Sequence, residues 1–128
     1  MKILHSNLIG DSDRHLFIIH GFLGMGDNWK SHAKKINADR IELFTGPYAK
    51  EFTNDRYRAV QQYVKCSEVA NDIDIEINAG HDLNQNNLKF FCQSLKNIKE
   101  VSIGHALITE SLYNGLESTI KSYLQILK

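Results

Sequence analysis

The chain has 128 residues, of which 42% are hydrophobic, and its 15 Lys and Arg are balanced by 15 Asp and Glu. Such a length and composition suit one folded domain and exclude a disordered segment. The formal charge of zero leaves no electrostatic footprint for nucleic acid or for an anionic membrane, so neither is an expected partner.

The chain is expected to be a soluble cytoplasmic protein without a signal peptide. Polar residues at 5–7 interrupt the amino-terminal apolar run, and the longest apolar stretch, 16–23, is too short to cross a bilayer. Cys66 and Cys92 are therefore expected to be reduced residues in or near the core.

Residues 1–36 predict a β-hairpin and one strand–helix unit. Strands are expected at 2–9 and 15–20, joined by the turn-rich tetrapeptide 10–13. The second strand is continuously apolar, which is typical of a strand buried on both faces. Asp27 can cap a helix over 28–36.

Three further strand–helix units are expected after residue 38. The predicted strands are 40–45, 73–77 and 101–103. The predicted helices run from Thr53 or Asn54 to about 70, over 88–95, and over a last segment near the carboxyl end. Because strands alternate with helices, the sequence predicts an α/β fold with a parallel sheet.

Two apolar patterns carry more detail. In the middle strand Ile73, Ile75 and Ile77 alternate with polar residues, which predicts a polar face suited to solvent or to a wet barrel mouth. The last helix has Gly115 as a candidate bend. Its apolar stripe consists of Leu112, Leu116, Ile120, Leu124 and Leu127.

Candidate functional residues follow the predicted strands, because parallel α/β sheets bind ligands beyond the carboxyl ends of their strands. A histidine there can exchange protons near neutral pH, and a helix that starts there favours a phosphate. The alternatives are a hydrogen-bonded loop histidine and a solvent-facing Glu42 or Glu76. The strand-end candidates are His20-Gly21, Glu42 with Thr45-Gly46, Asn78 with Gly80-His81, and Gly104-His105.

Other chemistries are excluded by spacing. No His-x-x-x-His or Cys-x-x-Cys pair predicts a metal site, and no P-loop or dinucleotide-binding motif predicts a cofactor. A Gly-x-Ser-x-Gly nucleophile motif is also absent from the sequence. We therefore expect neither a metal nor a cofactor.

Two parts of the sequence resemble known protein families. The stretch 20–29, HGFLGMGDNW, resembles the amino terminus of a small α/β-hydrolase-fold esterase. That resemblance implies an oxyanion-loop remnant at Phe22 or Leu23, whose backbone N–H would face the oxyanion. The serine, acid and histidine of such esterases have no counterpart in the chain.

Residues 37–128 resemble the carboxyl-terminal part of pyridoxine 5'-phosphate synthase, a (β/α)8 barrel. The matching stretches are 38–49, ADRIELFTGPYA, 77–84, INAGHDLN, and 102–108, SIGHALI. The resemblance implies that Glu42 stabilises the transition state and that His81 donates a proton. It also implies that Gly104, His105 and Asp82 bind substrate phosphate, although many members of the family have Gly at the position of Asp82.

The two resemblances together imply a fusion-like chain that divides into 1–36 and 37–128, with the join near 32–36. The expected architecture is the last three βα units of a partial (β/α) barrel, preceded by the hairpin and one hydrolase-type βα unit. The first five barrel strands would be missing.

The implied reaction condenses 1-deoxy-D-xylulose 5-phosphate with 3-amino-2-oxopropyl phosphate in vitamin B6 biosynthesis. We expect reduced or no activity from the isolated chain, because the early catalytic residues would be missing. The alternatives are a non-catalytic phosphate-binding remnant and an α/β-hydrolase fragment. An unclosed sheet is also expected to self-associate through its open edges.

Overall fold

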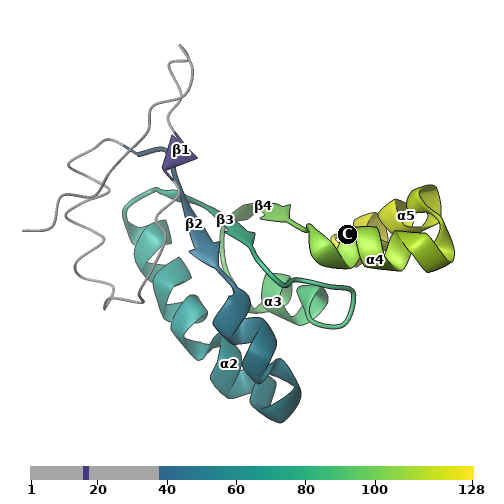
Figure 1. The fold of residues 1–128 in the computed structure, drawn as a ribbon. Helices are drawn as coiled ribbons and strands as arrows, with labels where there is room; N and C mark the ends of the chain where they lie inside the picture. Colours follow the sequence, from purple (N-terminus) through teal and green to yellow (C-terminus); the bar gives the residue numbers. More distant parts are fainter. Residues whose placement is uncertain (1–15, 18–37) are drawn as a thin grey trace, which may run out of the picture.

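The computed structural model describes residues 16–17 and 38–128 (Figure 1). The predicted hairpin, the helix over 28–36 and the residues Phe22 and Leu23 lie outside this described part. The described elements are β1 (Leu16–Phe17), β2 (Arg40–Phe44), α2 (Gly46–Asp72), β3 (Glu76–Gly80), α3 (Leu88–Ser94), β4 (Ile98–Ser102), α4 (His105–Asn114) and α5 (Leu116–Ile126).

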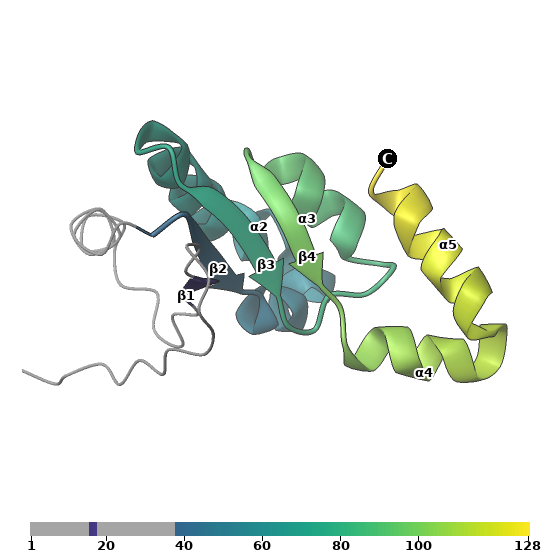
Figure 2. The same ribbon diagram turned by 90° about the horizontal axis from the view of Figure 1, so that it is seen from above.

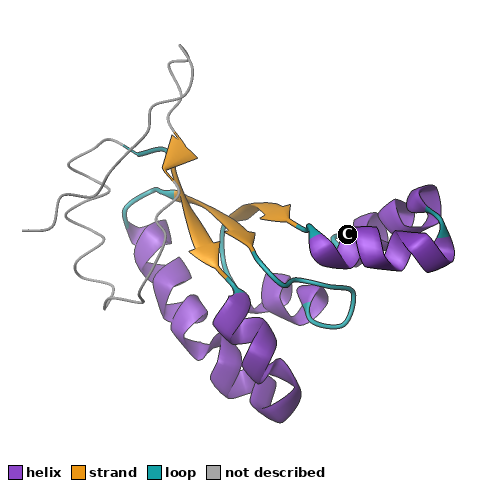
Figure 3. Cartoon of the chain, in the orientation of Figure 1, coloured by secondary structure: helices purple, strands orange, loops and turns teal. Residues whose placement is uncertain are grey.

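The strands form one parallel sheet in the order β1-β2-β3-β4. Helices α2 and α3 lie against one face of this sheet, whereas α4 and α5 lie beyond the end of β4 (Figures 1 and 2). The strands alternate with helices along the chain, as Figure 3 shows by colour. The predicted α/β class and parallel sheet are confirmed, and the arrangement is compatible with a partial β/α barrel.

The core lies between the sheet and α2 and α3. Its aromatic centre is formed by Tyr48, Tyr63 and Phe91, whose ring centroids lie 4.8–6.0 Å apart. The hydroxyl of Tyr48 donates to the Asn87 carbonyl at 2.7 Å, and that of Tyr63 donates to the Phe44 carbonyl at 3.0 Å. The phenols of Tyr48 and Tyr63 therefore both have a partner, and each one ties helix α2 to the end of another element.

Helix α2 begins earlier than predicted. It starts at Gly46, because Pro47 occupies the first turn, where a missing N–H costs no hydrogen bond. The helix is interrupted at Asp55, whose φ of −153° and ψ of 95° are non-helical. Oδ1 of Asp55 accepts hydrogen bonds from the backbone N–H groups of Tyr57 and Arg58, both at 3.0 Å. The residue that caps this second helical segment is therefore Asp55, and not Thr53 or Asn54 as predicted.

Strand β3 starts later than predicted. Ile73 ends α2, and Asp74 has a φ of 57°, so the chain turns before the strand begins at Glu76. The predicted solvent-facing polar side of this strand is wrong at Asn78, which is only 3% exposed. β3 is a central strand of the sheet, and the neighbouring strands β2 and β4 flank it on both edges.

The carboxyl-terminal part differs from the prediction in two ways. Strand β4 begins at Ile98 rather than at 101. The last helix is divided into two helices at Gly115, the residue predicted as a bend, whose φ of 78° suits a residue without a side chain. The two cysteines agree with expectation, since Cys66 and Cys92 are free and partly buried.

Candidate functional site

Three parallel strands end side by side at one edge of the sheet. The register pairs Phe44 of β2 with Gly80 of β3, and Gly80 with Ser102 of β4. This alignment brings the segments that follow each strand to the same edge (Figure 1). The sequence-predicted candidates from Glu42 to His105 therefore belong to one region of the molecule.

Thr45 holds the ends of β2 and β3 together. It is fully buried, and its backbone N–H donates to the Gly80 carbonyl at 2.8 Å. Its hydroxyl lies 2.7 Å from the same carbonyl oxygen and also contacts the carbonyl oxygen of His81. The Thr45 side chain thus holds the backbone at Gly80 and at His81, which is the predicted proton donor.

Glu42 lies across the sheet from Gly80. A Cβ added to Gly80 would lie 2.7 Å from Oε1 of Glu42, so a larger residue at position 80 would displace the carboxylate from its present position. Glu42 makes no hydrogen bond or ion pair with any described residue. Its carboxylate therefore has no partner among the described residues, and it lies beside the residue that precedes His81.

His81 and Asp82 occupy an unusual stretch of backbone. Their φ angles are 93° and 57°, and side chains favour neither value, although aspartate tolerates the left-handed region. Both side chains are 56% exposed, and Nδ1 of His81 lies 3.9 Å from Oδ2 of Asp82. The His81 ring packs edge-on against the ring of Phe44, with centroids 4.6 Å apart. The imidazole is thus oriented yet reachable from solvent.

Gly104 and His105 form the amino terminus of α4. The cap residue Gly104 makes no side-chain hydrogen bond to this end, so among the described residues the first backbone N–H groups of α4 can bind an anion. Both residues are exposed, and a Cβ on Gly104 would meet nothing within 4 Å. The helix is anchored to the β3–α3 loop, because Nε2 of Gln85 donates to Oε2 of Glu110 at 2.6 Å.

One face of the sheet lies opposite α2 and α3, and we call it the open face, because no described helix covers it. Arg40 and Glu76 pair there at 2.6 Å, and Arg40 also reaches Glu100 at 3.4 Å. Alternation along each strand assigns the remaining members. The open face consists of Arg40, Glu42, Phe44, Glu76, Asn78, Gly80, Glu100 and Ser102.

Sequence reasoning missed the structural roles of Thr45 and Phe44. Thr45 was noted only as a strand-end residue, and nothing in the apolar pattern marks Phe44 as the neighbour of His81. Both contacts join residues more than 30 positions apart, so no local pattern reveals them.

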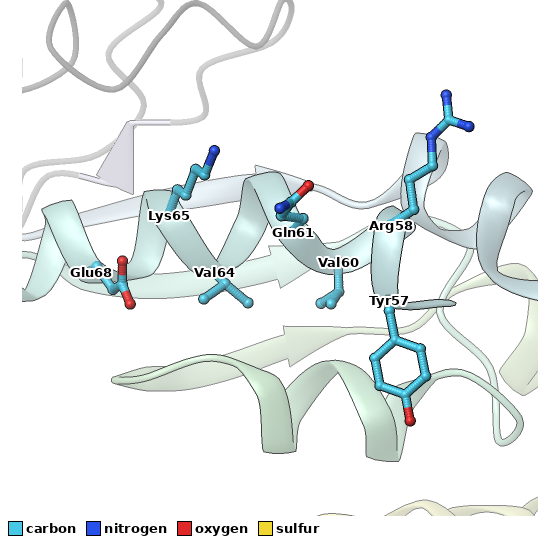
Figure 4. Close-up of a pocket in the computed structure, with 7 residues that line it drawn as sticks. All are labelled: Tyr57, Arg58, Val60, Gln61, Val64, Lys65 and Glu68. Atoms are coloured by element: carbon cyan, nitrogen blue, oxygen red, sulfur yellow. The ribbon is translucent and has the colours of Figure 1, made fainter. Parts of the chain in front are cut away.

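Other kinds of site have little support in the described part of the chain. No group of three His, Cys, Asp or Glu side chains there could hold a metal ion. None of the helices described is long and apolar enough to span a membrane. A hollow of about 500 Å³ lies along α2 (Figure 4), lined by Tyr57, Arg58, Val60, Gln61, Val64, Lys65 and Glu68. It includes no strand-end residue.

Comparison with known proteins gives consistent matches. The chain is 54% identical over 93 residues to the pyridoxine 5'-phosphate synthase of Porphyromonas gingivalis, which covers 73% of this chain and 39% of that protein. It is 46% identical over 96 residues to the synthase of Christiangramia forsetii, covering 75% and 40%. Over 107 residues it is 41% identical to that of Bacteroides thetaiotaomicron, covering 84% and 45%.

The chain spans about two-fifths of the length of these curated relatives. A family model also matches, and it extends from residue 19 to residue 128. The match includes Phe22 and Leu23, which the sequence analysis assigned to a hydrolase-like segment, so the boundary at 36/37 stays a prediction. The strand ends described above all lie inside the matched range, and the chain belongs to the family of the pyridoxal phosphate biosynthesis protein PdxJ.

Proposed function

We propose that this chain carries part of the active site of a pyridoxine 5'-phosphate synthase. The reaction would condense 1-deoxy-D-xylulose 5-phosphate with 3-amino-2-oxopropyl phosphate. The observation that carries the proposal is the Glu42 carboxylate, which has no partner among the described residues and lies beside Gly80, at the same edge of the sheet as the amino terminus of α4. A carboxylate, an imidazole and an anion site at adjacent strand ends suit acid–base chemistry on a phosphorylated substrate.

Each residue has a proposed role. His81 donates a proton, because its ring is exposed and is oriented by Phe44. Glu42 stabilises positive charge that develops in the transition state, because its carboxylate is free of any described cation. Gly104 and His105 bind phosphate through the N–H groups of α4. The Asp82 carboxylate lies next to His81 and would repel that phosphate if the two came close.

The first test is phosphate binding by the full chain. We expect millimolar inorganic phosphate to shift the Gly104 backbone amide resonance in the NMR spectrum. Gly104→Pro removes that N–H and should abolish the phosphate-dependent shift of the neighbouring His105 backbone amide, whereas Gly104→Ala keeps the N–H and should preserve that shift. An unmoved Gly104 resonance in the wild-type chain would contradict the phosphate site.

The second test is turnover. Purified chain is mixed with both phosphates, and pyridoxine 5'-phosphate is measured. We expect little or no product from the chain alone, because it spans about two-fifths of the synthases it matches. Turnover lost in His81→Ala would show that the described residues suffice, and it would overturn the expectation of low activity.

A non-catalytic phosphate-binding role is the second candidate. The uncapped amino terminus of α4 favours it, because that site needs no other catalytic residue. Phosphate binding without turnover, unaffected by His81→Ala, would support this role over catalysis.

A further inference from the structure

The hollow of about 500 Å³ along helix α2 is bordered by two rows of side chains, and we call the hollow and these rows the α2 surface. Figure 4 shows the rows projecting to opposite sides of the helix. The apolar row consists of Tyr57, Val60 and Val64, and the polar row consists of Arg58, Gln61 and Lys65. Each row repeats at i, i+3 and i+7, which is the spacing that presents a stripe to a second helix.

The charged side chains along the α2 surface are of one sign. Residues 56–67 include Arg56, Arg58 and Lys65 but no Asp or Glu. None of these three side chains pairs with a carboxylate among the described residues. Elsewhere in the described part, by contrast, Arg40 and Lys121 each pair with a glutamate. The α2 surface is therefore a group of cations without a counter-charge.

Two acidic residues stand at the ends of this segment. Oδ1 of Asp55 accepts hydrogen bonds from the backbone N–H groups of Tyr57 and Arg58, so this oxygen already serves as the helix cap. Glu68 lines the end of the hollow that lies away from Tyr57 (Figure 4). An acidic ligand therefore fits the part of the surface from Arg56 to Lys65 and not the end at Glu68.

Two aromatic rings orient the exposed Arg56 side chain. Its guanidinium carbon lies 5.2 Å from the ring centre of Tyr57 and 5.1 Å from that of Phe90. The two rings meet edge to face with centroids 5.3 Å apart, and Tyr57 is 67% exposed. Exposed arginine and tyrosine side chains that are already ordered lose little conformational entropy on binding, and these residue types dominate the binding energy of protein interfaces.

We propose that the α2 surface docks an acidic amphipathic helix of another protein. Apolar side chains of that helix fill the hollow over Val64 and beside Tyr57, and its carboxylates pair with Arg56, Arg58 and Lys65. The surface includes none of the proposed catalytic residues, so the inference is independent of the proposed function.

A protein helix suits this surface better than a single-stranded nucleic acid does. Bases bind to such proteins by stacking on free aromatic rings, whereas here the guanidinium of Arg56 already lies over the rings of Tyr57 and Phe90. The apolar row also offers contacts that a sugar-phosphate backbone cannot use.

The test compares two synthetic peptides that form the same amphipathic helix. In the acidic peptide a stripe of Leu is flanked by Glu, and in the neutral peptide Gln replaces every Glu. Fluorescence anisotropy of each labelled peptide is measured as the full chain is added. We expect the acidic peptide to bind about tenfold more tightly, with a preference that shrinks as salt is added. Its binding should also shift the Val64 methyl resonances in the NMR spectrum.

Two double variants with the same change in charge separate this surface from a general attraction. Arg58→Gln/Lys65→Gln removes the cations of the polar row and should weaken binding of the acidic peptide about tenfold. Lys121→Gln/Lys128→Gln removes two cations at the carboxyl-terminal end of the chain and should leave binding unchanged. Tyr57→Ser removes an apolar contact and should weaken both peptides. All five side chains are exposed, so each variant should melt as the wild-type chain does.

Four outcomes overturn the inference. Equal affinity of the wild-type chain for the two peptides shows that the cations recruit no carboxylate. Equal losses in the two double variants show attraction to net charge and not to the α2 surface. A single-stranded DNA oligonucleotide that binds more tightly than the acidic peptide, and displaces it, shows a nucleic-acid site. A light-scattering mass that falls in Arg58→Gln/Lys65→Gln without any peptide shows that a second copy of the chain occupies the surface.

Discussion

At the scale of single residues, Thr45 has the largest structural role near the candidate site. Its buried hydroxyl lies within hydrogen-bond distance of the carbonyl oxygens of Gly80 and His81, to which it can donate. Thr45→Val keeps the shape but leaves these carbonyls without their side-chain donor, so we expect a loss of about 1–3 kcal/mol in the free energy of unfolding.

Urea unfolding measures this loss, and Thr45→Ser, which keeps the hydroxyl, serves as the control. A Val variant as stable as the Ser variant would show that the hydroxyl contributes nothing at this position.

The thiol of Cys92 makes a separate prediction about pH. Burial raises its pKa from 9.0 to about 11, and burial also raises the pKa of Cys66. The unfolded chain therefore loses its thiol protons at lower pH than the folded chain does. The stability contributed by Cys92 is complete below pH 9 and is lost as the pH rises from 9 to about 11.

The expected loss from Cys92 is on the order of 2 kcal/mol over that interval. Unfolding measured at several pH values between 8 and 11 should show a shallower decline for Cys92→Ala than for the wild-type chain. Identical slopes would mean that the thiol is no more buried in the folded chain than in the unfolded chain. Burial also raises the pKa of Tyr48, so the comparison between the two chains, not either slope alone, isolates the cysteine.

At the scale of elements, the break in α2 depends on the cap at Asp55. Asp55→Ala removes the acceptor for the N–H groups of Tyr57 and Arg58, and we expect a loss of about 1 kcal/mol in stability. Asp55→Asn keeps a capping oxygen and should remain close to wild type. Thermal unfolding of the three chains tests the cap, and equal melting temperatures would show that the second segment of α2 forms without it.

The periodic patterns predicted the elements well where one face of an element meets the core. Leu88 and Phe91 are both fully buried, as the helical spacing of α3 indicated. Elsewhere a tertiary effect outweighed the local pattern. Ile73 and Ile75 alternate with polar residues, yet the chain is still turning through Asp74 there, because α2 extends to Asp72.

The sequence pattern named the residues of the candidate site, but it did not predict how they are arranged. Strand-end reasoning named Glu42, His81 and Gly104 because ligands bind beyond the ends of parallel strands. It could not reveal the contact between Phe44 and His81 or the burial of Asn78, since both depend on how separate strands are aligned. The strand register is therefore the information that the sequence pattern lacked.

At the scale of the whole molecule, the helical pair α4–α5 presents an apolar surface. In the apolar stripe that the sequence indicated, Leu112 is 80% exposed and Leu124 is 54% exposed. The large exposed side chains of this pair are Ile108, Leu112, Tyr113, Leu116, Ile120, Leu124 and Leu127. A surface of this kind favours association.

We therefore predict that the chain self-associates in a concentration-dependent way. Light scattering over a range of concentrations should show an average mass that rises with concentration for the wild-type chain. At each concentration the average mass should be lower for the double variant Leu112→Lys/Leu124→Lys. Tyr57→Lys, at a 67% exposed aromatic residue on α2, is the control and should leave association unchanged. A wild-type chain that stays a monodisperse monomer would contradict this prediction.

The ion pairs of Arg40 also set the depth of the open face. Because Arg40 joins Glu76 and Glu100, the amino-terminal end of this face is closed by matched charges. A ligand that entered from the strand ends would reach the carboxylate of Glu42 before these matched charges. Glu42 lies two residues before Phe44, the last paired residue of β2, which is about 7 Å along the strand, since each residue advances a strand by roughly 3.3 Å. The matched charges thus limit the depth of the space that a ligand could occupy on this face.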